Sequence, residues 1–253
     1  MQTEAFASGI QLDAQLSRTV PDYLQRNYWW AYVHPNAVRL FERQWLVNTI
    51  LCGNFARLRD AALDEFGAPI CGRTLQVACV YGDFSVRLAE RIGPGGCLDV
   101  VDVLAIQLQN LRRKLAASSP ATLYRRDSTA LGFADASYDQ AIIFFLLHEQ
   151  PPLVRKQTIA EALRVVKPGG KLVIVDYHRP SYLHPLRYLL WPVLRALEPY
   201  ALDLWEHDIS EWLPSLVQVS EIKKQTFYRG LYQKLMITVP VSSGAARRPD
   251  QEE

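Results

Sequence analysis

From Thr74 to Asp176 the sequence alternates between short apolar runs and longer amphipathic stretches, and this alternation restricts the fold more than any other feature. The apolar runs have the length of buried strands, and the stretches between them have the length of helices. Strands separated by helices imply parallel crossover units, so we expect an α/β fold with a doubly wound, mostly parallel sheet. The predicted strands are residues 75–79, 97–102, 121–125, a strand within 138–147, and 171–176.

The segments between and after these strands complete the expected sheet. One helix is predicted over residues 84–92, and two others have apolar faces at helical spacing. Residues 223–228 and 231–239 have the pattern of two strands joined near Gly230, which predicts an antiparallel closing hairpin. The two apolar helix faces are Leu104, Leu108, Leu111 and Leu115, and Leu153, Ile159, Leu163 and Val166.

Two helical additions are expected to form a cap on this Rossmann-like domain. Before residue 70, apolar residues recur at spacings of three and four; these are Val38, Phe41, Trp45, Leu46, Thr49 and Ile50. Three prolines, Pro185, Pro192 and Pro199, exclude a single straight helix in the apolar segment 180–215, so broken or kinked helices are expected there. We therefore predict a helical cap (1–69), a Rossmann-like domain (70–241) with a helical insertion at about 180–215, and poorly ordered ends (about 1–18 and 242–253).

Composition excludes several classes of protein. The net charge is only +2 and no run of lysine or arginine stands out, so a nucleic-acid partner is not expected. The four cysteines have neither metal-site spacing nor a disulfide pattern, which favours a reducing, cytoplasmic compartment. The longest central apolar run, residues 141–147, is too short to span a bilayer, and the N-terminal residues resemble no targeting signal.

In an open α/β sheet the ligand lies beyond the carboxyl ends of the strands. Asp102 ends the second strand about 20 residues after the first turn, where a carboxylate can accept both ribose hydroxyls of a nucleoside. Asp127 follows the third strand, where an adenine amino group would be received. The alternatives are a helix N-cap for Asp102 and a turn residue for Asp127.

The loop after the first strand retains Gly82 but has Ala78 and Val80 at positions where glycine is usual. Nucleotide phosphates need glycine so that backbone N–H groups can approach them. S-adenosylmethionine (SAM) has no phosphate, so the loop is compatible with SAM whose methionine part is repositioned. The predicted cofactor set is Ala78, Cys79, Gly82, Asp102, Val103, Asp127 and Ser128. The alternative is a decayed site that binds nothing.

Two motifs resemble those of ubiquinone- and menaquinone-biosynthesis methyltransferases. They are LGFADASYD at residues 131–139 and EALRVVKPGG at residues 161–170. Three further stretches resemble the rhodoquinone-biosynthesis (RquA) family, and this match covers nearly the whole chain: YWWAYVHP (28–35), VACVYG (77–82) and DYHRP (176–180).

The second resemblance implies a specific reaction. Its family is described as converting ubiquinone to rhodoquinone by exchanging a ring methoxy group for an amino group. SAM is then the amino donor and a substrate, and manganese is required. An altered glycine loop is a feature of that family. The resemblance also implies a prenylated quinone partner and peripheral association with the inner membrane, and it leaves the oligomeric state open.

Polar side chains at the carboxyl ends of the later strands are the candidates for chemistry. Manganese prefers carboxylate, imidazole and water ligands, so Asp176, His178 and Glu149 are the predicted metal ligands. The predicted catalytic residues are Tyr81, His148, Glu149 and Tyr177. The alternatives are a packing role for Tyr81, a hydrogen-bonded histidine beneath the site for His148, and a loop-ordering role for Asp176. Cys79 is interpreted as a small buried residue, and His34 as a helix-capping one.

Two aromatic segments, residues 28–33 and 182–205, combine tryptophan and tyrosine with apolar and basic residues. This mixture suits a membrane interface or an apolar tunnel. We expect a cap that also lines a quinone entrance; a cap packed only inward is the alternative.

Three functions remain open from the sequence. The first is amino transfer from SAM to a quinone, and the second is conventional SAM-dependent methylation of a quinone precursor. The third is a non-catalytic quinone-binding subunit.

Overall fold

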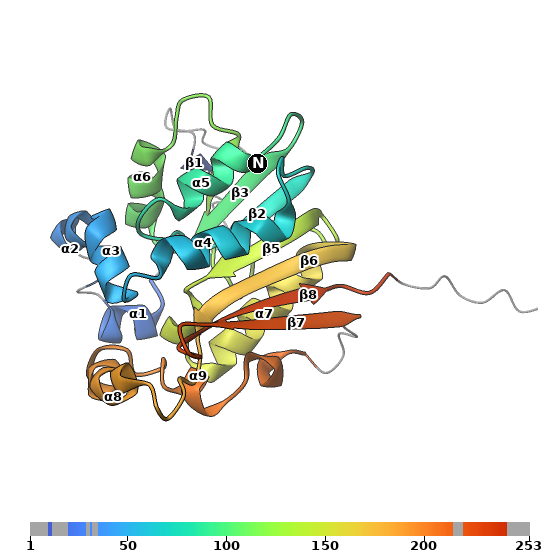
Figure 1. The fold of residues 1–253 in the computed structure, drawn as a ribbon. Coiled ribbons are helices and arrows are strands. Elements are labelled where there is room, and N and C mark those ends of the chain that lie inside the picture. The colour runs from blue at the N-terminus through green and yellow to red at the C-terminus, as the bar shows by residue number, and fades with distance from the viewer. Residues whose placement is uncertain (1–9, 12–19, 29–30, 32–34, 215–219, 242–253) are drawn as a thin grey trace, which may run out of the picture.

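The computed structural model describes residues 10–11, 20–28, 31, 35–214 and 220–241. Within these residues, eight strands form one sheet in the order β1-β4-β3-β2-β5-β6-β8-β7 (Figure 1). The strands are β1 (Ile10–Gln11), β2 (Arg73–Val77), β3 (Cys97–Asp102), β4 (Ala121–Arg125), β5 (Tyr138–Phe144), β6 (Val166–Tyr177), β7 (Glu221–Phe227) and β8 (Tyr232–Thr238).

Strand direction confirms the expected α/β fold. All pairs among β1 to β6 are parallel, and only the pairs that involve β8 are antiparallel. The chain builds outward from β2 through β3 to β4, and then returns to the other side of β2 to build β5 and β6. The carboxyl ends of β2 and β5 therefore flank the point where the strand order reverses, which is where ligands bind in such sheets.

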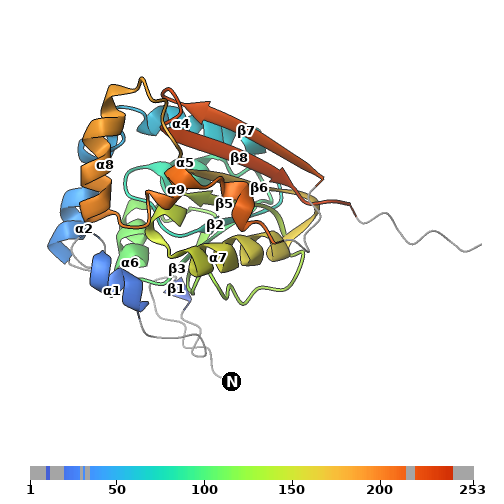
Figure 2. The same ribbon diagram turned by 90° about the horizontal axis from the view of Figure 1, so that it is seen from below.

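Helices cover both faces of the sheet, as Figure 2 shows for α4 and α7. The α-helices are α1 (Asp22–Asn27), α2 (Pro35–Phe41), α3 (Gln44–Ile50), α4 (Phe55–Leu63), α5 (Phe84–Arg91), α6 (Ala105–Lys114), α7 (Pro152–Val165), α8 (Pro185–Leu197) and α9 (Asp203–Glu206). Short 3-10 helices occupy Asp64–Phe66, Leu147–Glu149 and Ile209–Trp212. In both views α1, α2, α3 and α8 lie beyond the carboxyl ends of the parallel strands.

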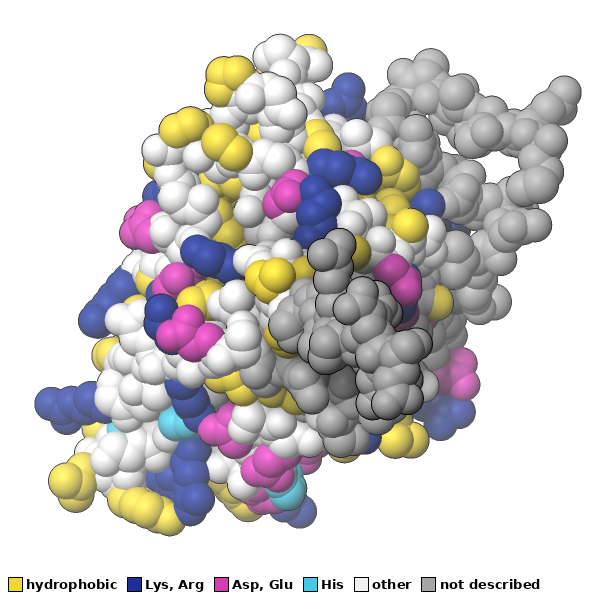
Figure 3. Space-filling model, turned by 90° about the vertical axis from the view of Figure 1, so that its right-hand side faces the viewer, with side chains coloured by type: hydrophobic (Ala, Val, Ile, Leu, Met, Phe, Trp, Pro, Cys, Tyr) yellow, Lys and Arg dark blue, Asp and Glu magenta, His cyan; other side chains and the backbone are white. Residues whose placement is uncertain are grey.

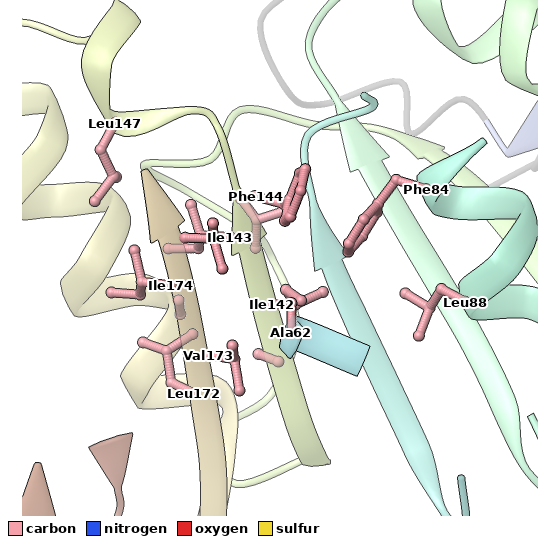
Figure 4. Packing of buried hydrophobic residues seen from close by; sticks show 14 of the residues in the cluster. Ala62, Phe84, Leu88, Ile142, Ile143, Phe144, Leu147, Leu172, Val173 and Ile174 are labelled. Atoms are coloured by element: carbon pink, nitrogen blue, oxygen red, sulfur yellow. The ribbon is translucent and has the colours of Figure 1, made fainter. Parts of the chain in front are cut away.

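The core is centred on β5 and β6 (Figure 4). Ile142 and Ile143 are adjacent on β5, point to opposite faces, and are both fully buried, because helices cover each face. Phe144 stacks on Phe84 of α5 with ring centroids 4.1 Å apart. Each such side chain stabilises the fold by about 2 kcal/mol through removal of apolar surface from water. The carboxyl ends of the central strands are therefore held rigidly.

Two predicted helix faces need correction. Leu153 is 77% exposed although Ile159 and Leu163 are buried, because residues six apart on a helix lie about 120° from one another around the axis. Trp45 and Ile50 are also exposed, since the chain breaks between α2 and α3 and a single helical register does not continue.

The insertion is helical as expected, but α8 continues through Pro192. No helix in the described part of the chain combines the length and apolar character needed to cross a bilayer. The predicted C-terminal tail lies outside the described residues, as does most of the predicted N-terminal end. The division at residue 70 stays a prediction.

Candidate functional site

Hydrogen bonds hold the loop after β2 in a strained backbone conformation at Ala78. Ala78 has a φ of 71°, a left-handed conformation that costs a non-glycine residue about 1 kcal/mol. Its N–H donates to the Val101 carbonyl (2.9 Å), and its carbonyl accepts from the buried Gln76 amide (2.9 Å). The same Gln76 amide donates to Ser85 of α5 (2.8 Å). These bonds offset the strain, so alanine stands in a conformation for which glycine is usual.

Gly82 and Tyr81 join this loop to the N-terminal helices. Gly82 has a φ of 80°, and a Cβ there would lie 2.8 Å from Gln44 and 3.1 Å from Phe55. The Tyr81 hydroxyl donates to the Ala31 carbonyl (2.7 Å) and accepts from Gln107 (2.8 Å). These contacts favour the packing alternative for Tyr81, and its contact with substrate stays a prediction.

Asp102 lies at the carboxyl end of β3 beside this loop. One carboxylate oxygen accepts from the Cys79 N–H (2.8 Å), and the other accepts from the Leu104 N–H (2.7 Å). Burial raises the pKa of Asp102 to about 6, although both backbone hydrogen bonds oppose the rise. The pKa of the Cys79 thiol is raised by burial and by the Asp102 charge, so the thiol of this half-buried residue stays protonated.

Asp127 and Ser128 follow β4 and face the same space. Asp127 accepts from the backbone N–H (2.8 Å) and the hydroxyl (2.7 Å) of Thr129, which fixes the turn. Ser128 accepts from Gln150 (3.0 Å) and shares a hydrogen bond with Thr158 (2.8 Å). Asp127 therefore acts as a turn residue, which was the alternative to a cofactor contact. It also lines the pocket.

One pocket collects most of the predicted cofactor residues. It lies at the carboxyl ends of β2, β3, β4 and β5, and six of the seven predicted residues line it, with Gly82 as the exception. The lining residues from this set are Ala78, Cys79, Asp102, Val103, Asp127 and Ser128, and Glu149 also lines it. The sequence patterns missed other lining residues, which are Pro21, Tyr23, Leu24, Val101, Leu104, Gln107, Arg126, Phe145, Leu146 and Gln150.

Tyr23 of α1 covers this pocket from a distant part of the sequence. Its pKa is raised by burial and by the negative charges of Glu149, Asp127 and Asp102, while a hydrogen bond with Gln150 opposes the rise. Tyr23 lines the pocket together with these three acidic residues. No local pattern predicts this contact, because it depends on how α1 folds back over the sheet.

His148 and Asp176 form a buried pair next to the pocket. His148 Nδ1 lies 2.9 Å from one Asp176 oxygen, and the backbone N–H of Leu147 donates to the other (2.8 Å). Burial lowers the pKa of His148, but the charge and hydrogen bond of Asp176, with smaller effects of Glu198 and Glu149, raise it overall to about 9. The imidazolium Nε2 lies 3.7 Å from the Glu149 carboxylate. Asp176 therefore orders the loop and also fixes the charge of His148.

Aromatic rings enclose this pair. Tyr177 and Phe145 meet the His148 ring edge-on at 5.0 and 6.0 Å. Phe145 has a φ of 53°, a strained conformation for a bulky residue, at the end of β5 where it lines the pocket. Tyr177 is buried, and burial raises the pKa of its hydroxyl. Glu198, which ends α8, also faces this cluster, and burial raises its pKa. Sequence reasoning missed Glu198 because nothing local distinguishes it from a surface glutamate.

The predicted metal ligands do not come together. Asp176 and His178 would share a face if β6 continued, but β6 ends at Tyr177. The His178 ring instead lies 2.8 Å from the Gly230 carbonyl in the β7–β8 turn. Among the described residues no group of three or more histidine, cysteine, aspartate or glutamate side chains has the geometry of a metal site. The set Asp176, His178 and Glu149 therefore does not fit a divalent ion.

Comparison with known proteins agrees with the fold. Residues 74–170 match the family described as "Methyltransferase domain". The chain is 31% identical over 202 residues to a demethylmenaquinone methyltransferase of Beutenbergia cavernae, covering 74% of this chain and 78% of the relative. It is 29% identical over 163 residues to the ubiquinone/menaquinone biosynthesis C-methyltransferase UbiE of Paracoccus denitrificans, covering 63% and 62% of the two chains.

Solved structures share the fold at low identity. The Haemonchus contortus phosphoethanolamine N-methyltransferase 2 in complex with SAM has a TM-score of 0.61 at 15% identity, covering 88% of this chain and 60% of that one. The N-methyltransferase NodS of Bradyrhizobium japonicum has a TM-score of 0.53 at 16% identity, covering 76% and 98%.

Proposed function

The chain belongs to the class I SAM-dependent methyltransferase superfamily, and from that premise we propose that it transfers a group from SAM to the ring of a prenylated quinone or quinone precursor. One observation carries this proposal most directly. Six residues chosen as cofactor contacts line a single pocket at the topological switch point, and the buried His148–Asp176 pair adjoins it.

The residues present fit SAM. We assign Asp102 to accept the ribose hydroxyls with the lone pairs that its two backbone hydrogen bonds leave, and Asp127 to accept a hydrogen bond from the adenine amino group. Ala78 and Glu149, which line the same pocket, would hold the methionine part, and Tyr23 would hold the nucleoside. When bound, SAM supplies an electrophilic methyl group and a primary amine.

Of the neighbouring residues Glu149, His148 and Asp176, only Glu149 lines the pocket, and we assign it to contact the reacting groups. His148 is a positioning residue, since its positive charge attracts the Glu149 carboxylate 3.7 Å away and Asp176 holds its ring. Phe145 and Tyr177 keep water from this pair, which strengthens its electrostatic interactions. This chain can therefore present an ordered carboxylate next to a quinone oxygen.

The relatives support methyl transfer as the reaction. The two reported above are named for methylation of quinone precursors, and one of them covers most of this chain. Methyl transfer to a ring carbon requires loss of a ring proton, and Glu149 is placed to accept a proton at the pocket wall.

A specific feature favours a second candidate, exchange of a ring methoxy group for an amino group supplied by SAM. A conventional glycine loop holds the methionine amine as a fixed ammonium, whereas an amine that attacks a ring must be neutral and free to move. In this exchange the amine displaces the ring methoxy group as methanol. The quinone then oxidises the N–Cα bond to an imine and becomes a quinol, and hydrolysis of the imine leaves the amino group on the ring. Ala78 has a Cβ at a position where the loop usually has glycine, and this Cβ alters the space available to that amine. This altered loop supports amino transfer as in the rhodoquinone-biosynthesis family.

One labelling experiment separates these candidates. The purified protein is incubated with ubiquinone, or with its demethylated precursor, and with SAM labelled either with ¹³C in the methyl group or with ¹⁵N in the amine. Mass spectrometry of the extracted quinone then shows which label is incorporated. Carbon label supports methyl transfer and nitrogen label supports amino transfer. If neither label enters either quinone while SAM still binds, the proposal fails and a non-catalytic quinone-binding subunit becomes the better account.

A further inference from the structure

Helix α8 is apolar yet lies almost entirely on the surface. Thirteen large hydrophobic side chains are exposed among the described residues, and seven of them fall between residues 182 and 197. Within α8 only Leu194 is buried. We call these seven the α8 face: Tyr182 (62% exposed), Leu183 (88%), Tyr188 (67%), Leu189 (62%), Trp191 (47%), Val193 (43%) and Leu197 (46%). A patch of this kind marks an interaction surface.

The charged residues within the segment that carries the α8 face, residues 179–197, all have one sign. Residues 179–197 contain three arginines and no aspartate or glutamate. Arg179, Arg187 and Arg195 form no ion pair with any described residue; instead they lie over aromatic rings. The guanidinium of Arg187 lies 4.5 Å from the Tyr182 ring centre, and that of Arg195 lies 5.3 Å from the Trp191 ring centre. Tryptophan, tyrosine and unpaired arginine around an apolar patch match the water–lipid interface of a bilayer.

A hollow behind α8 strengthens this match. Its lining consists of two arginines, one glutamate and three apolar or aromatic side chains: Arg179, Arg187, Glu206, Trp191, Leu202 and Trp205. Two guanidinium groups in one hollow next to exposed apolar side chains can receive a phosphate that is attached to acyl chains. A second apolar surface lies at the same end of the molecule, where Leu40 of α2 and Trp45 and Ile50 of α3 are exposed.

The opposite side of the molecule is different. Figure 3 shows the face turned away from α2, α3 and α8, and there acidic and basic side chains are mixed. The α8 face lies at the other end of the molecule, beyond the carboxyl edge of the sheet.

We propose that the α8 face is a docking surface for a bilayer that contains anionic phospholipid, with the hollow lined by Arg179 and Arg187 receiving the headgroup phosphate. A symmetric contact between two copies is disfavoured because it would gather the arginines of both copies in one interface to which residues 179–197 contribute no acidic side chain. The inference deepens the proposed function, since a prenylated quinone resides in the bilayer, but it depends on the surface and not on the group transferred.

Vesicle sedimentation tests the inference. The full-length protein is mixed with vesicles of phosphatidylcholine alone or of phosphatidylcholine with phosphatidylglycerol, and the bound fraction is measured. We expect binding to the anionic vesicles that weakens with added salt. The double variant Leu189→Ser/Trp191→Ser should bind about tenfold more weakly or worse, because two side chains that enter the lipid are lost. Arg179→Gln/Arg187→Gln, which removes both guanidinium groups of the hollow, should weaken binding to the anionic vesicles by about tenfold or more, at about 1 kcal/mol for each charge.

The matched control is Leu153→Ser/Ile222→Ser, which removes two exposed apolar side chains outside the α8 face. It should bind vesicles as the unaltered protein does, and thermal melting should show all three variants folded. Equal weakening by the control, or an unaltered protein that stays in solution with both vesicle types, would overturn the inference. So would a dimer, seen by analytical ultracentrifugation, that Leu189→Ser/Trp191→Ser abolishes without an effect on vesicle binding.

A separate readout distinguishes this inference from the proposed function. The labelling reaction is repeated in water with a quinone that lacks the long prenyl tail. We expect Leu189→Ser/Trp191→Ser to retain label incorporation with this substrate and to lose it with quinone held in vesicles. Vesicle binding without incorporation into any quinone would leave the docking surface standing and would refute the proposed function alone.

Discussion

Replacement of Asp176 by asparagine tests the central electrostatic feature of the site. The change removes the negative charge that lies 2.9 Å from His148 Nδ1 and nearly preserves the side-chain volume. Burial lowers the pKa of His148, and the charge of Asp176 is the largest of the effects that raise it to about 9. The difference between this value and the ordinary one of 6.5 corresponds to about 3 kcal/mol in favour of the imidazolium in the folded protein.

The sign of the pH dependence follows from the direction of this pKa change. Because the pKa of His148 is higher in the folded than in the unfolded protein, its contribution to stability is fully present below pH 6.5 and is lost as the pH rises through about 9. The difference in unfolding free energy between the unaltered protein and His148→Gln should therefore be about 3 kcal/mol larger near pH 6 than near pH 10. Urea unfolding at both pH values measures it.

In Asp176→Asn the effect of burial should dominate, so the pKa of His148 should fall below 6.5. NMR of protein with ¹⁵N-labelled histidine follows this titration, and His148→Gln identifies the signal among the five histidines. Asp208→Asn, which removes a carboxylate bonded to Lys224 outside the pocket lining, should leave the titration of His148 unchanged. A His148 titration near pH 9 that persists in Asp176→Asn would refute the reasoning.

Three further predictions concern the pocket. Ala78→Gly should relieve the left-handed strain and change the unfolding free energy by less than about 1 kcal/mol. Gly82→Ala should lower the unfolding free energy by about 2 kcal/mol because its Cβ meets Phe55. Urea unfolding measures both changes, and a larger loss of stability in Ala78→Gly than in Gly82→Ala would contradict this prediction. SAM affinity, measured by calorimetry, should fall about tenfold per pH unit below pH 6 as Asp102 becomes protonated, and an affinity that is flat down to pH 5 would argue against the ribose contact. Tyr23→Ala should weaken SAM binding by about tenfold or more by uncovering the nucleoside, and unchanged affinity would show that α1 does not cover the bound cofactor.

The sheet could be predicted from sequence because its signals are local. The predicted bounds of β3 and β4 agree with the structure, since each strand is a short apolar run limited by turn residues. The positions of Asp102 and Asp127 at one edge then follow from parallel pairing alone, because all carboxyl ends of parallel strands meet there.

The rest of the site depends on contacts that no local pattern encodes. Tyr23 reaches the pocket, and Glu198 reaches the surroundings of His148, from helices whose placement is fixed by packing over the sheet. The predicted metal site was wrong for a related reason. Spacing of two residues places Asp176 and His178 on one face only while the strand continues, and the strand ends between them.

The same limit applies to exposure. Apolar spacing predicted a buried helix face that includes Leu153 and a shared helix face that includes Trp45, but the side chains of both residues are mostly exposed. Periodicity reports which residues share a helix face, and it does not report whether another element covers that face.

The most direct test of the account is a crystal structure of this protein with S-adenosylhomocysteine. We predict that the ribose hydroxyls lie within hydrogen-bonding distance of Asp102, that the adenine amino group lies at Asp127, and that Tyr23 covers the nucleoside. A ligand bound elsewhere, or a nucleoside that contacts neither carboxylate, would contradict the account.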